Sequence, residues 1–238
     1  VNYLSNSNLY ATSDSVLRRD FARFQQDGIR YISLSLYWIS IEPSTQEVYS
    51  DTFLANVKRV VNIASEYNIK VLVTIHTLWG SDSSWCTPSY VNPREGHTIV
   101  RDPAIKQAFL NMFTYTVRYM AGGKHWAWAL LNEPWVGQTG DKESFIDLIQ
   151  KMSAIVKTYD PGKLTTVRFI DSLFVQDFAW DQRIFDALDF IGLNWGSASN
   201  INGCVQRGKQ VWITEFGKNS GNDSKQASYY KEAISWYI

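Results

Sequence analysis

Two glutamates at the ends of apolar runs have the make-up of a paired-carboxylate site. Glu133 closes the apolar stretch that begins at His125, and Glu215 closes the stretch that begins at Gln210. Short, continuous apolar runs are typical of buried strands in a parallel sheet. An acid at the carboxyl end of such a strand lies where barrel and open-sheet enzymes hold their chemistry. Two carboxyl groups at one rim can act as acid and as nucleophile or base in glycoside hydrolysis.

The other segments alternate between strand and helix patterns, and they must bring the two glutamates to one rim. Apolar runs predict strands at Val1–Ser5, Ile29–Trp38, Lys70–Leu78, the run before Glu133, Leu164–Asp171, Asp189–Trp195 and the run before Glu215. Helical spacing and caps predict helices at Ser13–Asp27, from Asp51 onward, Pro103–Met120, Asp141–Asp160, Val175–Leu188 and Ser224–Ile238. The stretch between Trp195 and the last strand is judged too short for a full helix with its turns.

This alternation favours an α/β fold, a (β/α)8 TIM-type barrel, over a doubly wound sheet. It predicts a single catalytic domain spanning residues 1–238. No Gly-rich phosphate-binding turn follows a strand, which argues against a nucleotide-binding sheet. Because no eighth strand is evident, we expect a compact barrel that lacks this strand or is truncated there. An open barrel exposes strand edges, and a homo-oligomer could cover such an edge.

Charge and hydropathy restrict the class of partner. Lys plus Arg and Asp plus Glu number 23 each, so nothing favours nucleic acid or an anionic membrane as a partner. No apolar run approaches the roughly 18 residues of a membrane-spanning helix. The N-terminus lacks the basic and apolar regions of a signal peptide. A processed secreted protein would look the same, so localisation stays open, with an extracellular one favoured.

The sequence gives little support to metal or cofactor chemistry. Cys86 and Cys204 form no CxxC pair and have no clustered histidines, so we expect neither a metal nor another cofactor. A disulfide between these cysteines stays open as an alternative in an extracellular protein. A metal-dependent hydrolase would need His or Asp clusters at strand ends, where only His76 stands. His97 and His125 lack metal-ligand spacing and are interpreted as ordinary residues.

Several strand ends carry a family resemblance. Leu131–Pro134 (Leu-Asn-Glu-Pro) and Ile213–Gly217 (Ile-Thr-Glu-Phe-Gly) resemble the acid/base and nucleophile motifs of the clan A glycoside hydrolases. These are retaining barrel enzymes with catalytic glutamates after the fourth and seventh strands. Gly28–Trp38, Val71–His76 and Asp189–Trp195 are similar to the second, third and sixth strands of families 1 and 5. The resemblance extends from about residue 14 to residue 217.

The resemblance implies a role for each matching residue. Glu133 would protonate the leaving oxygen and then deprotonate water, and Glu215 would attack the anomeric carbon. Asn132 would hydrogen-bond the sugar 2-hydroxyl, and His76 would help to bind the sugar in the −1 subsite. Asn194, at the end of the sixth strand, is also assigned to substrate binding.

Three features depart from the family pattern. Ser33 occupies the second-strand position where relatives commonly have an arginine that supports the nucleophile. Arg168 on the fifth strand is a candidate substitute, with an ordinary salt bridge on the barrel as the open alternative. Trp195, which we also assign to substrate binding, stands where many relatives have a tyrosine that contacts the nucleophile. The eighth strand and its customary tryptophan are missing.

Ten tryptophans suggest that some aromatic rings stack on sugar. Trp38, Trp79 and Trp135 end or follow strands on the predicted catalytic rim, so they are assigned to substrate binding. Trp85 in the long third loop could line a subsite. The pair Trp126 and Trp128 lies within the fourth strand, and we interpret both rings as packing.

These observations favour a retaining glycoside hydrolase that cleaves β-linked polysaccharide with two glutamates. Short loops after the predicted strands four to six suggest an open groove and an endo-β-glucanase or β-mannanase type of activity. An exo-acting β-glycosidase is one alternative. A non-catalytic carbohydrate-binding barrel is another, because the second-strand arginine and the last strand are missing. In each case the partner is an oligo- or polysaccharide.

Overall fold

The computed structural model describes residues 2–3, 12–76, 87–88, 90–91, 98–136, 141–178, 180–215, 224–225, 227–228 and 231. Its centre is a parallel sheet in which neighbouring strands follow sequence order. The strands are β1 (Asn2–Tyr3), β2 (Tyr31–Tyr37), β3 (Lys70–His76), β4 (Ala127–Asn132), β5 (Leu164–Ile170), β6 (Ile191–Asn194) and β7 (Val211–Glu215). Sequential parallel pairing with helices between the strands is the arrangement of a (β/α)8 barrel, which confirms the predicted fold.

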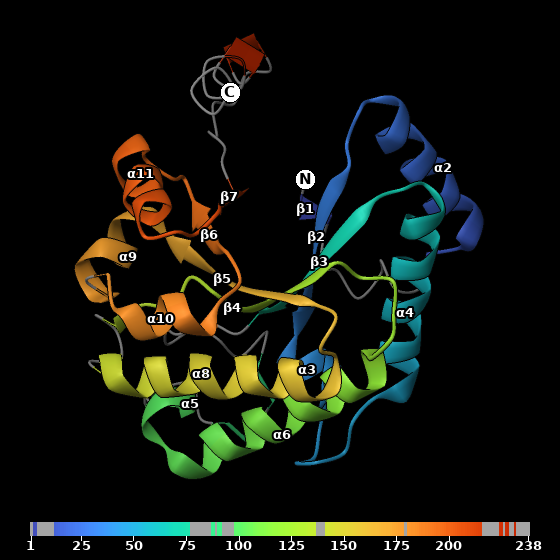
Figure 1. Cartoon of the computed structure of the whole chain (residues 1–238). Coiled ribbons are helices and arrows are strands. Elements are labelled where there is room, and N and C mark those ends of the chain that lie inside the picture. Colours follow the sequence, from blue (N-terminus) through green and yellow to red (C-terminus); the bar gives the residue numbers. More distant parts are fainter. Residues whose placement is uncertain are drawn as a thin grey trace.

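Helices surround the strands, from α2 and α4 on one flank to α9 and α11 on the other (Figure 1). They are α2 (Asp14–Gln26), α3 (Trp38–Ile41), α4 (Asp51–Glu66), α5 (Thr98–Arg101), α6 (Pro103–Met120), α8 (Lys142–Tyr159), α9 (Asp171–Phe178), α10 (Gln182–Ala187) and α11 (Ala198–Gln206). Near the C-terminus, Ser224, Lys225, Ala227, Ser228 and Lys231 are helical.

Three long helices begin at or within one residue of their predicted starts, each with a side chain that caps the first turn. The side chain of Asp102 accepts from the Ala104 N–H at 2.8 Å, and that of Asp141 accepts from the Ser144 N–H at 3.0 Å. The cap of α4 is Ser50, whose Oγ accepts from the Phe53 N–H at 3.3 Å, rather than the predicted Asp51. Asp51 lies instead in the first turn, where its charge suits the helix dipole.

Two helical predictions need correction. The chain between β6 and β7 does hold a helix, the nine-residue α11, and Ser197 caps it by accepting from the Asn200 N–H at 3.3 Å. The helix fits because β6 ends at Asn194 and only short turns flank α11. The segment predicted as one helix over 175–188 is divided between α9 and α10. Trp180, with φ at +58°, lies between these two helices and marks the break.

The outer strands of the sheet are β1 and β7. Every residue of β4 and β6 is buried, whereas every residue of β7 is partly exposed. No eighth strand is found within the part of the chain that the structure describes. Among these residues β7 is therefore an edge strand, and the barrel is open beside it.

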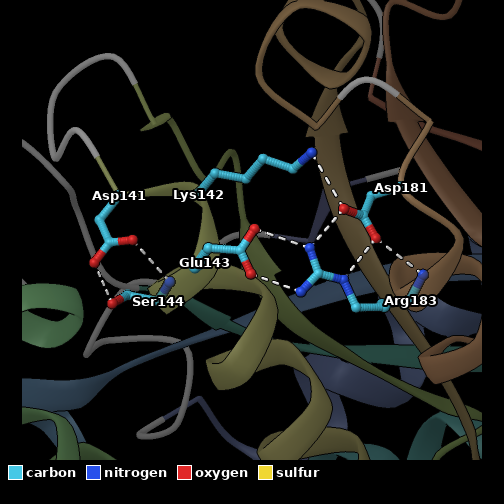
Figure 2. Close-up of polar contacts among 6 residues, drawn as sticks. All are labelled: Asp141, Lys142, Glu143, Ser144, Asp181 and Arg183. Atoms are coloured by element: carbon cyan, nitrogen blue, oxygen red, sulfur yellow. Dashed lines mark hydrogen bonds and ion pairs between the residues drawn. The ribbon is translucent and has the colours of Figure 1, made fainter.

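An ion-pair network joins the start of α8 to the start of α10 (Figure 2). The guanidinium of Arg183 bonds both oxygens of Glu143, at 2.6 Å and 2.9 Å. It also bonds both oxygens of Asp181, at 2.9 Å and 2.8 Å. Lys142 adds an ion pair to Asp181 at 3.2 Å. The network fastens two helices that follow neighbouring strands of the sheet.

Candidate active site

The structure brings Glu133 and Glu215 together around one amide group. Nδ2 of Asn194 donates to Oε1 of Glu133 at 2.7 Å and lies 3.3 Å from Oε2 of Glu215. Oδ1 of Asn194 accepts from the hydroxyl of Thr214 at 2.7 Å, which fixes the orientation of the amide. Since both carboxylates contact the same nitrogen, these two oxygens are at most about 6 Å apart, which suits two groups that act on one bond.

A buried arginine contacts the second of these glutamates. Nη2 of Arg168 lies 2.7 Å from Oε2 of Glu215, and its side chain is 3% exposed while that of Glu215 is 32% exposed. Burial lowers the pKa of Arg168, while the negative charges of Glu215 and Glu133 act in the opposite direction. The candidate substitute on the fifth strand therefore does meet the predicted nucleophile. Ser33 on β2 instead shares a hydrogen bond with Thr74 at 3.1 Å.

The backbone is irregular where the site is built. The β4–β5 pairing shifts between Ala129 and Asn132, and the β6–β7 pairing shifts at Asn194. Such irregularities re-aim side chains at strand ends. Glu133 and Trp195 directly follow these strands with φ of +51° and +58°. A non-glycine residue in this left-handed region is uncommon and often marks a functional site.

Two further predicted residues lie at strand ends close to this site. His76 ends β3, and its ring meets that of Tyr37 edge-on, with centroids 5.2 Å apart. Burial lowers the pKa of His76 to about 4, and the charge of Arg168 contributes in the same direction. Asn132 is 6% exposed and is paired in register with Arg168. A neutral His76 can serve as a hydrogen-bond partner without adding charge to the site.

Two of the predicted tryptophans are accessible at this rim. Trp135, two residues after Glu133, is 38% exposed, and Trp195, directly after Asn194, is 45% exposed. The Trp195 N–H donates to the Glu215 carbonyl at 2.7 Å, so its backbone is fixed beside the predicted nucleophile. The N–H of Val136 donates to Oδ2 of Asp177 at 2.9 Å, which anchors the chain after Trp135 to α9. Both side chains therefore have accessible surface at this rim.

Trp38 and Asn194 have different roles from those predicted. Trp38 is fully buried, its ring packs edge-on against Phe109 at 5.2 Å, and its Nε1 donates to Oε2 of the buried Glu42 at 2.7 Å. A side chain without accessible surface cannot stack on a sugar, so Trp38 belongs to the core. Asn194 is also fully buried, and its amide is occupied by Glu133, Glu215 and Thr214, so it positions the glutamates. The sequence could not show that these side chains are buried. Trp38 follows an apolar strand and Asn194 ends one, as an exposed residue of the rim also would.

Some predictions lie outside the described residues, namely those on Trp79, Trp85, Cys86 and His97. Cys204 is buried, with a free thiol. Trp128 is fully buried and Trp126 packs with Trp212 and Phe190, as predicted for packing residues. His125 is buried against Asp160 at 2.9 Å, at the opposite end of β4 from Glu133.

Two absences apply to the described part of the chain. Its His, Cys, Asp and Glu side chains form no group of three or more placed to hold a metal ion. Among the same residues, no helix has the length and apolar character needed to cross a bilayer.

The reasoning from sequence missed Thr214, whose hydroxyl orients Asn194. Its position next to Glu215 was the available signal. In the β6–β7 pairing Leu193 faces Ile213 and Asn194 faces Glu215, so Thr214 is the extra residue at the register shift. Such an irregularity re-aims side chains, and here the Thr214 hydroxyl reaches Asn194.

Comparisons with known proteins bear on the family and the fold of the chain. The family model "Cellulase (glycosyl hydrolase family 5)" matches residues 4–190, which include Glu133 and Arg168 but end before Glu215. No curated protein matches the chain at the sequence level.

Solved structures share the fold at low identity. The β-glycosidase BGL167 superposes with a TM-score of 0.68 at 14% identity, covering 93% of this chain and 72% of that one. The exo-β-1,4-mannosidase from Opitutaceae bacterium strain TAV5 gives 0.67 at 13% identity, covering 82% and 37% of the two chains. Endo-glycoceramidase II from Rhodococcus sp. gives 0.53 at 15% identity, covering 63% and 44%. The match of the family model over most of the sequence shows that the chain belongs to the cellulase family, glycosyl hydrolase family 5, and is a glycoside hydrolase.

Proposed function

We propose that the chain cleaves β-linked polysaccharide with retention of configuration, using Glu133 and Glu215 in a double displacement. The observation that supports this most is the shared donor. Nδ2 of Asn194 contacts one oxygen of each carboxylate, so these two oxygens lie at most about 6 Å apart, which would let both acids act on one glycosidic bond.

The surroundings of the two glutamates support different roles. Glu215 contacts a buried cation, so its ionised form is favoured, as a nucleophile requires. It would attack the anomeric carbon while Glu133 donates a proton to the leaving oxygen. In the second step Glu133 would take a proton from water, and that water would release the sugar from Glu215. Asn132 would bind the 2-hydroxyl, and His76 the same sugar ring, in the −1 subsite.

An open groove supports endo-action on a glucan or mannan. Helix α9 begins directly after β5, and only a short turn separates β6 from α11, so no long loop rises from these strands. The exposed rings of Trp135 and Trp195 would stack on sugar residues of the chain on either side of the cleaved bond. An extended polymer could then lie across the rim.

An exo-acting β-glycosidase is the second candidate. It is favoured by the names of two similar structures, a β-glycosidase and an exo-β-1,4-mannosidase, although likeness at this identity supports the fold alone. The two candidates differ in product pattern. An endo-enzyme lowers the viscosity of a polymer early, whereas an exo-enzyme releases single sugars from the chain end.

The test is release of reducing ends from soluble β-glucans, mannans and xylans, with Glu133→Gln and Glu215→Gln as controls. We expect release from one class of polymer and its loss in both variants. A matched control is Glu143→Gln, which removes a carboxylate of the surface network and should keep the activity. Binding to a polymer without release of products by the parent protein would favour the non-catalytic carbohydrate-binding barrel instead.

A further inference from the structure

We infer that Arg168 is the positioning residue for both catalytic glutamates, holding Glu215 with its side chain and Glu133 with its backbone. The inference rests on the proposed function of these glutamates. Arg168 itself lies below the surface, at 2% exposure, and so acts on the reaction through its neighbours. It stands on β5, between the strands that carry the two acids.

The side-chain half of this arrangement is a buried ion pair. Nη2 of Arg168 lies 2.7 Å from Oε2 of Glu215, the same oxygen that Asn194 approaches at 3.3 Å. Two donors on one oxygen fix the rotation of the carboxylate as well as its charge. The guanidinium is rigid and planar, so its packing inside the barrel sets where Glu215 can lie.

The backbone half holds the other acid. The carbonyl oxygen of Arg168 accepts from the N–H of Glu133 at 2.7 Å. Glu133 has a φ of +51°, a conformation that costs a non-glycine residue free energy and persists only where its surroundings fix it. This hydrogen bond fixes the first residue after β4. The distance between the two acids is thus set by one residue of β5.

The titratable groups around Arg168 come from three other strands or their ends. Glu215 on β7 and Glu133, directly after β4, face it with negative charge, and the charge of the guanidinium helps to lower the pKa of His76 on β3. From β6 the neutral amide of Asn194 contacts both acids. Among the described residues, β2 contributes Ser33, bonded to Thr74, and no cation. Arg168 is therefore the cation that this part of the barrel supplies to the nucleophile.

The experiment compares Arg168→Gln and Arg168→Lys with the parent protein. The matched control is Arg183→Gln, which also removes a guanidinium from between two carboxylates, on the surface and away from the site. Rates are measured on aryl β-glycosides across pH. In parallel, the carboxyl carbon of Glu215 is titrated by NMR in protein labelled at glutamate, with Glu215→Gln identifying its signal. Thermal melts report folding.

We expect Arg168→Gln to lower kcat about 100-fold or more, with KM changed only a few-fold. The acidic limb of the pH profile and the NMR titration of Glu215 should both move up by about one to three pH units, because the cation that favours the carboxylate is gone. Arg168→Lys should recover at least tenfold in kcat, and Arg183→Gln should behave as the parent.

An unchanged NMR titration in folded Arg168→Gln protein would overturn the inference, as would kcat within threefold of the parent. These outcomes are distinct from failure of the proposed function. In that case the parent itself would hydrolyse no glycoside, and the NMR titration would still decide whether Arg168 controls the charge of Glu215.

Discussion

Glu133 and Glu215 share a hydrogen-bond donor although 82 positions of sequence separate them: Nδ2 of Asn194 contacts an oxygen of each. The side-chain amide of Asn194 cannot flip, exchanging its oxygen and nitrogen, without losing the hydrogen bond from the Thr214 hydroxyl. The Asn194 amide therefore positions the two carboxylates relative to one another, and Thr214 fixes the amide in turn. Substitutions at these two residues test the arrangement.

Removing the shared donor should lower turnover more than binding. We expect Asn194→Ala to reduce kcat about 100-fold with KM changed only a few-fold, because both carboxylates lose their common anchor. Thr214→Val, which keeps the amide but frees its orientation, should cost about tenfold. Steady-state kinetics on an aryl β-glycoside measure both effects. A kcat for Asn194→Ala close to that of the parent would show that the shared contact is dispensable.

His76 should give the native state a dependence on pH. Its pKa is lowered to about 4, below the ordinary value of 6.5, chiefly by burial and then by Arg168. Below pH 6.5 the unfolded chain binds the proton more readily, so the free energy of unfolding falls as pH drops from 6.5 to about 4. The loss reaches at most about 3.5 kcal/mol, since one pKa unit corresponds to about 1.4 kcal/mol.

Urea unfolding at a series of pH values measures this effect. His76→Gln should flatten the dependence in that window. Some slope should remain, because burial also lowers the pKa of His125, and that residue stays in the variant. Equal slopes in parent and variant would mean that His76 is protonated alike in the folded and unfolded states.

The exposed and buried tryptophans should respond differently to substitution. Trp135→Ala and Trp195→Ala should each raise KM for a polysaccharide about tenfold, equivalent to about 1.4 kcal/mol of lost binding, with folding preserved. Binding isotherms and melting curves separate the two effects. An unchanged KM in both variants would show that these two rings do not bind the polysaccharide.

Trp38→Phe should instead lower the stability of the fold and leave substrate binding unchanged. It removes the donor that Glu42 accepts inside the core, so it should lower the free energy of unfolding by about 1 to 3 kcal/mol. The KM of the folded protein should match that of the parent. A raised KM without loss of stability would show that Trp38 contacts the substrate.

The sequence predicted the barrel and the two glutamates because they depend on local patterns. A buried parallel strand ending in a carboxylate is visible as an apolar run followed by Glu, as at Glu133 and Glu215. Helix starts were visible for the same reason, since signals such as Pro103 in a first turn and the cap Asp141 act within a few residues.

What the sequence could not show depends on contacts between strands. The link from Arg168 to Glu215 joins β5 and β7, and that from Asn194 to Glu133 joins β6 and β4. Trp38 looked like a rim residue because it follows β2, yet α3 begins at Trp38 and turns its ring into the core. The helix α11 was excluded because the gap between the two predicted strands was judged too short for a full helix with its turns, yet nine residues and short turns fill it.

The proposed double displacement requires that Glu215 forms a covalent bond to the sugar. The most direct measurement is mass spectrometry of the protein after incubation with activated 2-deoxy-2-fluoro-β-glucosides and β-mannosides, which slow the release of such an intermediate. We expect one sugar per chain, attached at Glu215 by peptide mapping and absent from Glu215→Gln. Attachment at another residue, or an active enzyme that never acquires the sugar, would contradict it.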